Sequence, residues 1–269
     1  MTIDTFFDRL WADYVAMTPQ AGQIKQAFED QGESITNDHV AFRTLALKPI
    51  GLARLEQHVL ELGYREFAPY EFTEKKLFAK GYTPPKPGYP RIFISELKVH
   101  ELSPAAAEIL TRIAGQIEAS RVNQADVMWA GTLWEPISVA EYELLQAESE
   151  YAAWFASIGL RPNHFTISIN DLKKTTSVEA VLKVVEGLGL AVNTSGGRVK
   201  GSPEVLLEQG STLADVMPIR FAGGEVREIP TCYYEFAKRY PAADGKLFQG
   251  FVAASADKIF ESTDSRVKN

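Results

Sequence analysis

Two histidines in similar sequence contexts are the residues of this chain best suited to bind a metal ion. His39 lies in the run 37–44, Asn-Asp-His-Val-Ala-Phe-Arg-Thr, and His164 in the run 163–168, Asn-His-Phe-Thr-Ile-Ser. Both runs predict strands, on which alternate side chains share a face. His39 then shares a face with Arg43, and His164 with Ser168, while large apolar side chains point the opposite way. Imidazoles that face a common cavity are frequent metal ligands.

A carboxylate could complete such a site. The run 231–239, Thr-Cys-Tyr-Tyr-Glu-Phe-Ala-Lys-Arg, predicts a strand that places Tyr233 and Glu235 on one face. A glutamate within so apolar a strand needs a partner, and a metal cation would serve. Glu228 and Glu96 are alternative third ligands, since each lies on another predicted strand. Two imidazoles and one carboxylate leave three octahedral positions open, which is the facial arrangement of non-haem Fe(II) enzymes.

Other polar residues on these faces are candidates to bind a substrate. Arg43 lies roughly 13 Å along the predicted strand from His39, at a rise of about 3.3 Å per residue. This separation suits a guanidinium that holds the far carboxylate of a small diacid in a bidentate manner. Tyr233 and Ser168 share the faces that carry the histidines and glutamate, and either could donate a hydrogen bond to the substrate.

The elements that must position these residues form two similar modules. Each histidine strand is followed by an amphipathic helix that ends at a Leu-Gly pair, at Gly63 and at Gly189. Thr176 and Glu179 predict a capping box at the start of the second of these helices. The chain is therefore predicted to be one α+β metalloenzyme domain over 1–269. Its parts are N-terminal helices (1–34), a first βαβββ module (35–102), a helical insert (103–160), and a second βαβββ module with a C-terminal segment (161–261).

The strands of the second module are predicted from turn residues. The Ala-Gly-Gly sequence at 222–224 predicts a hairpin between strands 216–221 and 225–229, and residues 231–237 supply the closing strand. The tail after Phe260, which ends with the polar run 262–269, is predicted to be loose.

Composition excludes several classes of partner. The net charge is −7 and the isoelectric point is near 5.3, and no cluster of Lys and Arg is present, so neither nucleic acid nor an anionic membrane is an expected partner. Cys232 is the single cysteine, which favours a reducing compartment. The acidic start and the lack of a long apolar run favour a cytoplasmic protein.

Several of these segments together resemble a known family. They are Thr18-Pro19-Gln20-Ala21, the His39-to-Arg43 run, Phe93-Ile94-Ser95-Glu96-Leu97, Asn163-His164-Phe165-Thr166 and Tyr233-Tyr234-Glu235-Phe236-Ala237. The chain resembles, over residues 3–261, the 2-oxoadipate dioxygenase/decarboxylase family, also called D-2-hydroxyglutarate synthase, which is related to the vicinal oxygen chelate superfamily. The resemblance implies a curved mixed sheet, or half-barrel, around an Fe(II) site. It assigns His39, His164 and Glu235 as metal ligands and Arg43 as the substrate-binding arginine.

The resemblance also implies a reaction. A 2-oxo acid, with 2-oxoadipate expected first, would chelate Fe(II) and react with O₂ to give carbon dioxide and D-2-hydroxyglutarate, a step of lysine degradation. Two alternatives remain open. The same ligands could hold Zn²⁺, Ni²⁺ or Mn²⁺ for a hydrolysis, isomerisation or lyase reaction without redox chemistry. The chain could instead be a non-catalytic module that binds a small diacid. The sequence does not fix the oligomeric state.

Overall fold

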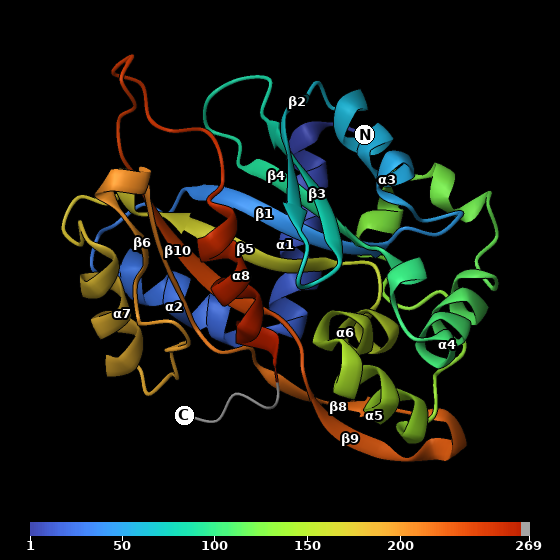
Figure 1. Ribbon diagram of the computed structural model, residues 1–269. Coiled ribbons are helices and arrows are strands. Elements are labelled where there is room, and N and C mark those ends of the chain that lie inside the picture. The colour runs from blue at the N-terminus through green and yellow to red at the C-terminus, as the bar shows by residue number, and fades with distance from the viewer. Residues whose placement is uncertain (265–269) are drawn as a thin grey trace.

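An eight-stranded mixed sheet organises the molecule, and the computed structural model describes residues 1–264 of it (Figure 1). The strand order across this sheet is β2-β3-β4-β1-β5-β10-β7-β6. In chain order its strands are β1 (Asn37–Leu45), β2 (Arg65–Phe72), β3 (Leu77–Thr83), β4 (Arg91–Leu97), β5 (Pro162–Ser168), β6 (Lys200–Ser202), β7 (Leu207–Ser211) and β10 (Tyr233–Arg239).

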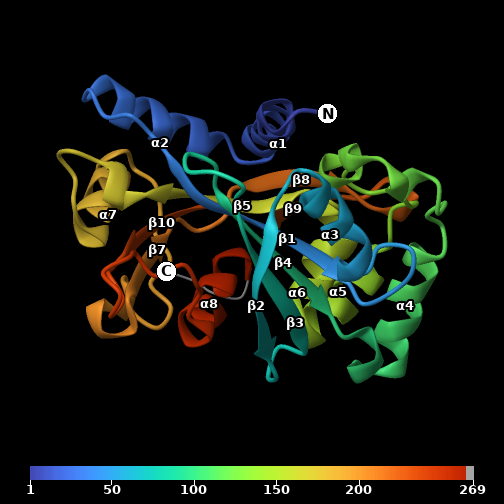
Figure 2. The ribbon, with the colours of Figure 1, turned by 90° about the horizontal axis from the view of Figure 1, so that it is seen from above.

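The helices cover the sheet on both sides. They are α1 (Ile3–Met17), α2 (Pro19–Asp30), α3 (Leu52–Glu61), α4 (Pro104–Ala114), α5 (Val139–Glu148), α6 (Glu150–Ile158), α7 (Val178–Gly187) and α8 (Ala253–Ile259). α1 and α2 lie on one side of the sheet, and α8 lies on the other (Figure 2). α8 contacts β2 at one end of the sheet and β6 and β7 at the other. The sheet therefore curves around α8, and the predicted half-barrel is confirmed.

The two halves of the sheet meet along β1 and β5, which run antiparallel. In this register His39 of β1 lies opposite Thr166 of β5, and Thr166 lies opposite Glu235 of β10. The neighbouring row carries His164 of β5 beside Tyr233 of β10. Because side chains in one such row point to the same face, the pairing brings both histidines and the glutamate together on the concave face.

The strands that lie, in chain order, between the helix and the closing strand of the second module differ from the prediction. Segments 216–221 and 225–229 do form the predicted hairpin, as β8 (Val216–Arg220) and β9 (Val226–Pro230), but this hairpin is a separate two-stranded sheet. The main sheet instead contains the short strands β6 and β7. Both include a glycine and lack a clear alternation of apolar residues, which is why the sequence pattern does not indicate them.

Two local predictions also need correction. Ser177, one residue after Thr176, caps α7 and accepts a hydrogen bond from the Ala180 amide, so the predicted capping box does not form. Residues 260–263 are a 3₁₀ turn packed against the core instead of the start of a loose tail, and the rest of the predicted tail, 265–269, lies outside the described residues. Within residues 1–264, no helix is long and apolar enough to cross a membrane.

Candidate metal centre

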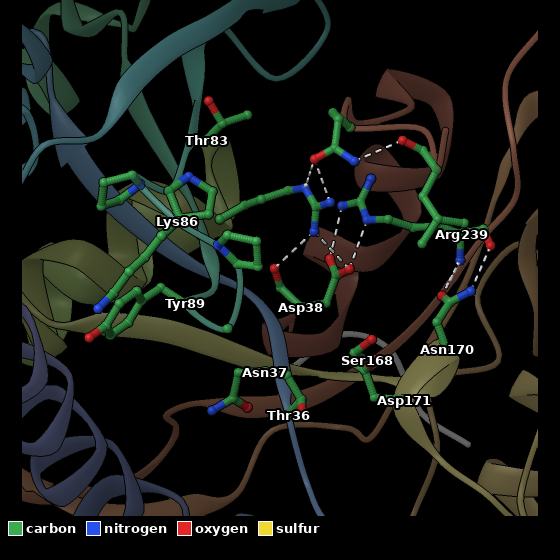
Figure 3. Close-up of a pocket in the computed structure, with 17 residues that line it drawn as sticks. Thr36, Asn37, Asp38, Thr83, Lys86, Tyr89, Ser168, Asn170, Asp171 and Arg239 are labelled. Carbon is green, nitrogen blue, oxygen red and sulfur yellow. Dashed lines mark hydrogen bonds and ion pairs between the residues drawn. The ribbon is translucent and has the colours of Figure 1, made fainter. Parts of the chain in front are cut away.

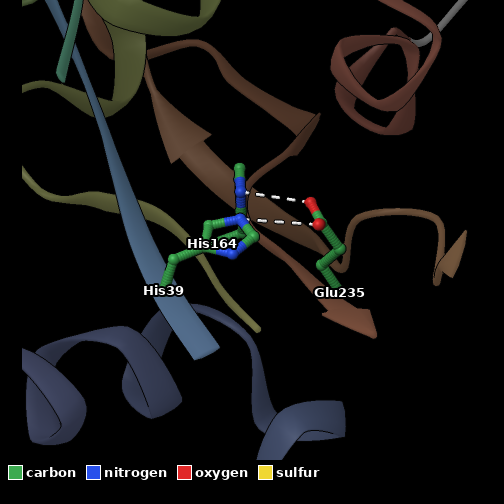
Figure 4. A group of neighbouring side chains, drawn as sticks. All are labelled: His39, His164 and Glu235. Atoms are coloured by element: carbon green, nitrogen blue, oxygen red, sulfur yellow. Dashed lines mark ion pairs between the residues drawn. The ribbon is translucent and has the colours of Figure 1, made fainter. Parts of the chain in front are cut away.

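His39, His164 and Glu235 converge on the concave face of the sheet (Figure 4). Their candidate ligand atoms all lie within 4.8 Å of one another, and all three residues are buried. Nε2 of His39 lies 3.4 Å from Glu235 Oε1, and Nε2 of His164 lies 3.3 Å from Glu235 Oε2. Two neighbouring ligands that are each about 2.1 Å from one ion lie roughly 3 Å apart. The observed separations are thus close to those of adjacent ligands of a metal.

A bulge precedes each histidine and supplies a hydrogen-bond partner for its ring. In β1, Asn37 and His39 pair with consecutive residues of β5, so Asp38 is an extra residue of β1. In β5, Pro162 and His164 pair with consecutive residues of β1, so Asn163 is an extra residue of β5. Nδ1 of His39 lies 2.8 Å from Asp38 Oδ2, and Nδ1 of His164 lies 3.1 Å from the amide oxygen of Asn163. These oxygens only accept, so each Nδ1 carries the proton and each Nε2 presents its lone pair to the site.

Asp38 is held in its ionised form by two arginines. Nε and Nη2 of Arg239 donate to its two oxygens at 2.7 and 2.9 Å, and Nη1 of Arg91 donates at 3.2 Å. Burial opposes ionisation, but the charge of Arg239 and the hydrogen bond from His39 hold the pKa of Asp38 well below its ordinary value. A carboxylate behind an imidazole fixes the ring and makes its free nitrogen a better ligand.

The electrostatics of the three residues fit a divalent cation. Burial raises the pKa of Glu235, and burial together with His39 and Arg43 lowers the pKa of His164 well below its ordinary value, so this imidazole is neutral. Gln209 donates to Glu235 Oε1 at 2.6 Å, but the buried Oε2 has no hydrogen-bond partner. An orphaned carboxylate oxygen 3.3 Å from the unprotonated Nε2 of His164 is unfavourable without a cation. The residues present therefore fit a metal of the 2-His-1-carboxylate type.

The other candidate residues are distributed around this centre. Tyr233 stacks on His164 with ring centroids 4.5 Å apart, and its buried hydroxyl has no partner. Arg43 is buried farther along β1, where its Nε has no partner. Glu96 accepts a hydrogen bond from the Leu52 amide at the start of α3, and Glu228 is exposed on β9. Neither alternative carboxylate belongs to the group of candidate ligands.

A C-terminal segment, residues 251–263, closes the concave face over the metal centre. The chamber at the three ligands has a volume of only about 20 Å³ and is lined on one side by Phe251, Ala256, Ile259 and Phe260. Phe251 packs edge-on against the His39 ring, with centroids 5.0 Å apart. Such a chamber has room for about one water molecule. The chamber as it stands is too small for an organic substrate, so a substrate needs a movement of its walls.

A larger cavity of about 490 Å³ lies behind Asp38 (Figure 3). Ser168, predicted to bind substrate, lines this cavity and not the chamber at the three ligands. Asp38 and Arg239 also line it and lie between it and the back of His39. Ser168 is therefore separated from the three ligands, while Arg43 and Tyr233 line neither of these two spaces and lie beside the chamber.

Several residues at the site are not indicated by the sequence pattern. Strand alternation places Asp38 on the face opposite His39. The one sequence signal for its role is that Asn163 stands in the same position, directly before the second histidine. Gln209 lies on a strand that the sequence does not predict. The closing residues Phe251 and Phe260 belong to a segment without strong periodicity, so no pattern indicates that they cover the site.

The chain is similar to several known proteins. The family model described as 2-oxoadipate dioxygenase/decarboxylase matches residues 7–249. The chain is 34% identical to a 2-oxoadipate dioxygenase/decarboxylase of Oryza sativa subsp. japonica, over 97% of this chain and 80% of the relative. It is 33% identical to the solved hydroxyglutarate synthase from Oryza sativa in complex with 2-oxoadipate, with a TM-score of 0.92 and coverage of 97% and 91% of the two chains. A solved putative hydrolase from Shewanella frigidimarina NCIMB 400 is 45% identical, with a TM-score of 0.88 and coverage of 93% and 98%.

Proposed function

We propose that this chain, which belongs to the 2-oxoadipate dioxygenase/decarboxylase family, carries out the Fe(II)- and O₂-dependent oxidative decarboxylation of a small 2-oxo acid. The first substrate to test is 2-oxoadipate, which is bound in the rice hydroxyglutarate synthase. One 2-oxoadipate and one O₂ would give one 2-hydroxyglutarate and one carbon dioxide, which balances all atoms. Its D configuration, a cytoplasmic location and a role in lysine degradation are further predictions.

The observation that carries the proposal is the set of three buried ligands with an unpaired carboxylate oxygen. His39, His164 and Glu235 would hold the ion. Fe(II) bound there would supply the one-electron chemistry through which O₂ reacts with a chelated 2-oxo acid.

The protein contributes orientation. The hydrogen bonds from His39 to Asp38 and from His164 to Asn163 fix both imidazoles with Nε2 toward the ion. Gln209 holds one oxygen of Glu235 by a 2.6 Å hydrogen bond and leaves the other oxygen free to bind the metal. Ligands held in this way need little rearrangement when substrate arrives.

Two buried donors are available for the oxygens of the substrate. The Tyr233 hydroxyl and Arg43 Nε both lack partners. We assign Tyr233 a hydrogen bond to the substrate near the metal, because its ring lies on His164. We assign Arg43 the far carboxylate, because it lies farther along β1 on the same face. Ser168 could contribute only from the larger cavity. Phe93, Phe251 and Phe260 line the chamber and would exclude water during the reaction.

The proposal is tested with a panel of 2-oxo acids of different chain length. Protein loaded with Fe(II) without oxygen is mixed with each acid and O₂, and both oxygen consumption and carbon dioxide release are followed. With 2-oxoadipate, we expect one carbon dioxide released for each O₂ consumed, and 2-hydroxyglutarate as the product. No oxygen consumption with any acid, although iron and acid are bound, would contradict the proposal.

A second candidate function is metal-dependent hydrolysis, which the description of the 45% identical Shewanella protein as a putative hydrolase favours. The same three ligands could hold Zn²⁺, Ni²⁺ or Mn²⁺ and activate a water molecule. This reaction would consume no oxygen and would proceed with a metal that has no redox chemistry. Activity of the Zn²⁺-loaded protein under nitrogen would therefore support the second candidate over the first.

A further inference from the structure

The guanidinium of Arg43 is already paired with a carboxylate of the protein. Its side chain is only 1% exposed, and Nη1 donates to Glu150 Oε1 at 2.7 Å. Nη2 donates to the Thr263 hydroxyl at 2.9 Å, and this hydroxyl donates to the same oxygen of Glu150. The charge of Arg43 is therefore compensated before any substrate binds.

This pairing leaves little capacity for a second carboxylate. A bidentate carboxylate uses two guanidinium nitrogens, and only Nε of Arg43 is without a partner. The rings of Tyr151, Trp154 and Phe260 lie 4.9–5.8 Å from the guanidinium carbon. Two carboxylates beside one buried cation would leave a net negative charge away from water, which is costly.

We propose that Glu150 occupies, in the substrate-free protein, the place on Arg43 that the far carboxylate of a diacid takes, so that a diacid must displace it to bind. Glu150 is then an internal competitor that sets the affinity for diacids relative to 2-oxo acids with an apolar end. This inference rests on the proposed function, because it assumes that Arg43 binds the far end of the substrate.

Glu150 has a place to move to. It is the first residue of α6 and also lines a separate cavity of about 180 Å³, together with Lys75 and Lys76. A carboxylate that turns into this cavity would stay at the positive end of the helix. It would lie near Lys75 and Lys76, which already pair with Asp257 and Glu148. Glu74 and Glu261 also line this cavity, so the displaced carboxylate is compensated less well there than on Arg43, and the diacid must supply the difference in free energy.

Opening of the site and release of Arg43 are coupled through the C-terminal segment. Phe260 lines both the chamber at the metal ligands and the 180 Å³ cavity, so it forms a wall between them. Thr263, three residues later, is a partner of both Arg43 and Glu150. A movement of this segment that enlarges the chamber for a six-carbon acid also removes one hydrogen bond that ties Glu150 to Arg43.

The expected effect follows from the population of free Arg43. If Glu150 occupies Arg43 in about nine of ten molecules, the apparent dissociation constant for a diacid is raised about tenfold. Glu150→Gln removes the competing charge and should strengthen diacid binding by about this factor. A 2-oxo acid with a methyl group at its far end gains nothing from Arg43, so its affinity should not change.

The experiment measures binding without turnover. Fe(II)-loaded protein is titrated calorimetrically under nitrogen with 2-oxoadipate and with 2-oxohexanoate, which has a methyl group in place of the far carboxylate. The variants are Glu150→Gln and Glu150→Asp. The second variant keeps the negative charge on a shorter side chain. Glu148→Gln is the matched control, because Glu148 lines the same cavity but pairs with Lys76 and Ser103.

We expect the Glu150 variants to bind 2-oxoadipate more tightly, by about tenfold for Glu150→Gln and less for Glu150→Asp, with 2-oxohexanoate and the Glu148 control unchanged. Equal gains for both acids, the same gain in Glu148→Gln, or weaker 2-oxoadipate binding would overturn this inference while leaving the proposed function intact. Failure of the wild-type protein to bind either acid would overturn both.

Discussion

Replacement of Glu235 by glutamine should stabilise the metal-free protein and abolish metal binding. Without an ion, Glu235 Oε2 faces the Nε2 lone pair of His164 at 3.3 Å and has no donor. A glutamine can keep its oxygen on Gln209 and place its amide nitrogen where Oε2 lies. The amide would then donate to His164, so that a repulsive contact becomes a hydrogen bond.

The size of the effect can be worked from this geometry. Leaving a buried acceptor unsatisfied costs about 1–3 kcal/mol, and we take about 2 kcal/mol for Glu235 Oε2. For a chain of this size, that free energy corresponds to a rise of about 4–8 °C in the melting temperature. A metal at about 100 times its dissociation constant should stabilise the wild type by about 2.7 kcal/mol and the variant not at all.

Thermal unfolding with and without Fe(II), followed by circular dichroism under nitrogen, measures both effects. The variant should melt above the wild type without metal and below it, or level with it, when metal is present. Glu56→Gln is the control, because Glu56 is a buried carboxylate that accepts hydrogen bonds from Lys80 and Tyr82 at 2.9 and 2.8 Å. It should destabilise the protein in both conditions. A metal-free Glu235→Gln protein that melts at or below the wild-type temperature would refute the reasoning.

Four further predictions concern the three ligands and the residues around them. Arg43→Gln should weaken 2-oxoadipate binding about 10- to 100-fold, because one charge-assisted contact is lost, and should leave the metal content unchanged. Calorimetry and metal analysis measure the two effects, and an equal loss of metal and substrate would contradict the assigned role. Asp38→Asn should weaken metal binding about 10- to 100-fold, because Arg239 loses its counter-charge and His39 its anionic partner, and a competition titration with a chelator measures this; unchanged affinity would count against it. Because burial raises the pKa of Glu235, acid should remove the metal at a higher pH than from an exposed glutamate of ordinary pKa 4.5. Without metal, the wild type should lose stability as the pH rises from 4.5 through this raised value, since the folded chain then binds more protons than the unfolded chain; a melting temperature independent of pH in this window would contradict it.

The main features of the fold and the convergence of the three ligands could be predicted from the sequence. Strand alternation placed His39 and Glu235 on the faces that the structure brings together, since a period of two depends only on local geometry. The same alternation misplaced Asp38, because a bulge interrupts the period and turns its side chain toward His39. A bulge depends on how a strand pairs with its neighbours, which a single sequence does not reveal.

The covering of the site could not be predicted for a different reason. The C-terminal segment is buried only because the curved sheet offers it a concave surface, and that surface is assembled from strands far away in the chain. Arg43 and Glu150, which pair at 2.7 Å, are 107 residues apart, and no pattern links them. Short strands such as β7, which contains Gly210, are likewise defined by their neighbours more than by their own composition.

The most direct measurement is a crystal structure of the iron-loaded protein with 2-oxoadipate, prepared without oxygen and recorded at the iron absorption edge. The account predicts a single anomalous peak about 2.1 Å from His39 Nε2, His164 Nε2 and a Glu235 oxygen, with the carboxylate and keto oxygens of the acid bound to the same ion. An iron peak elsewhere, or an acid bound without contact to the iron, would contradict it.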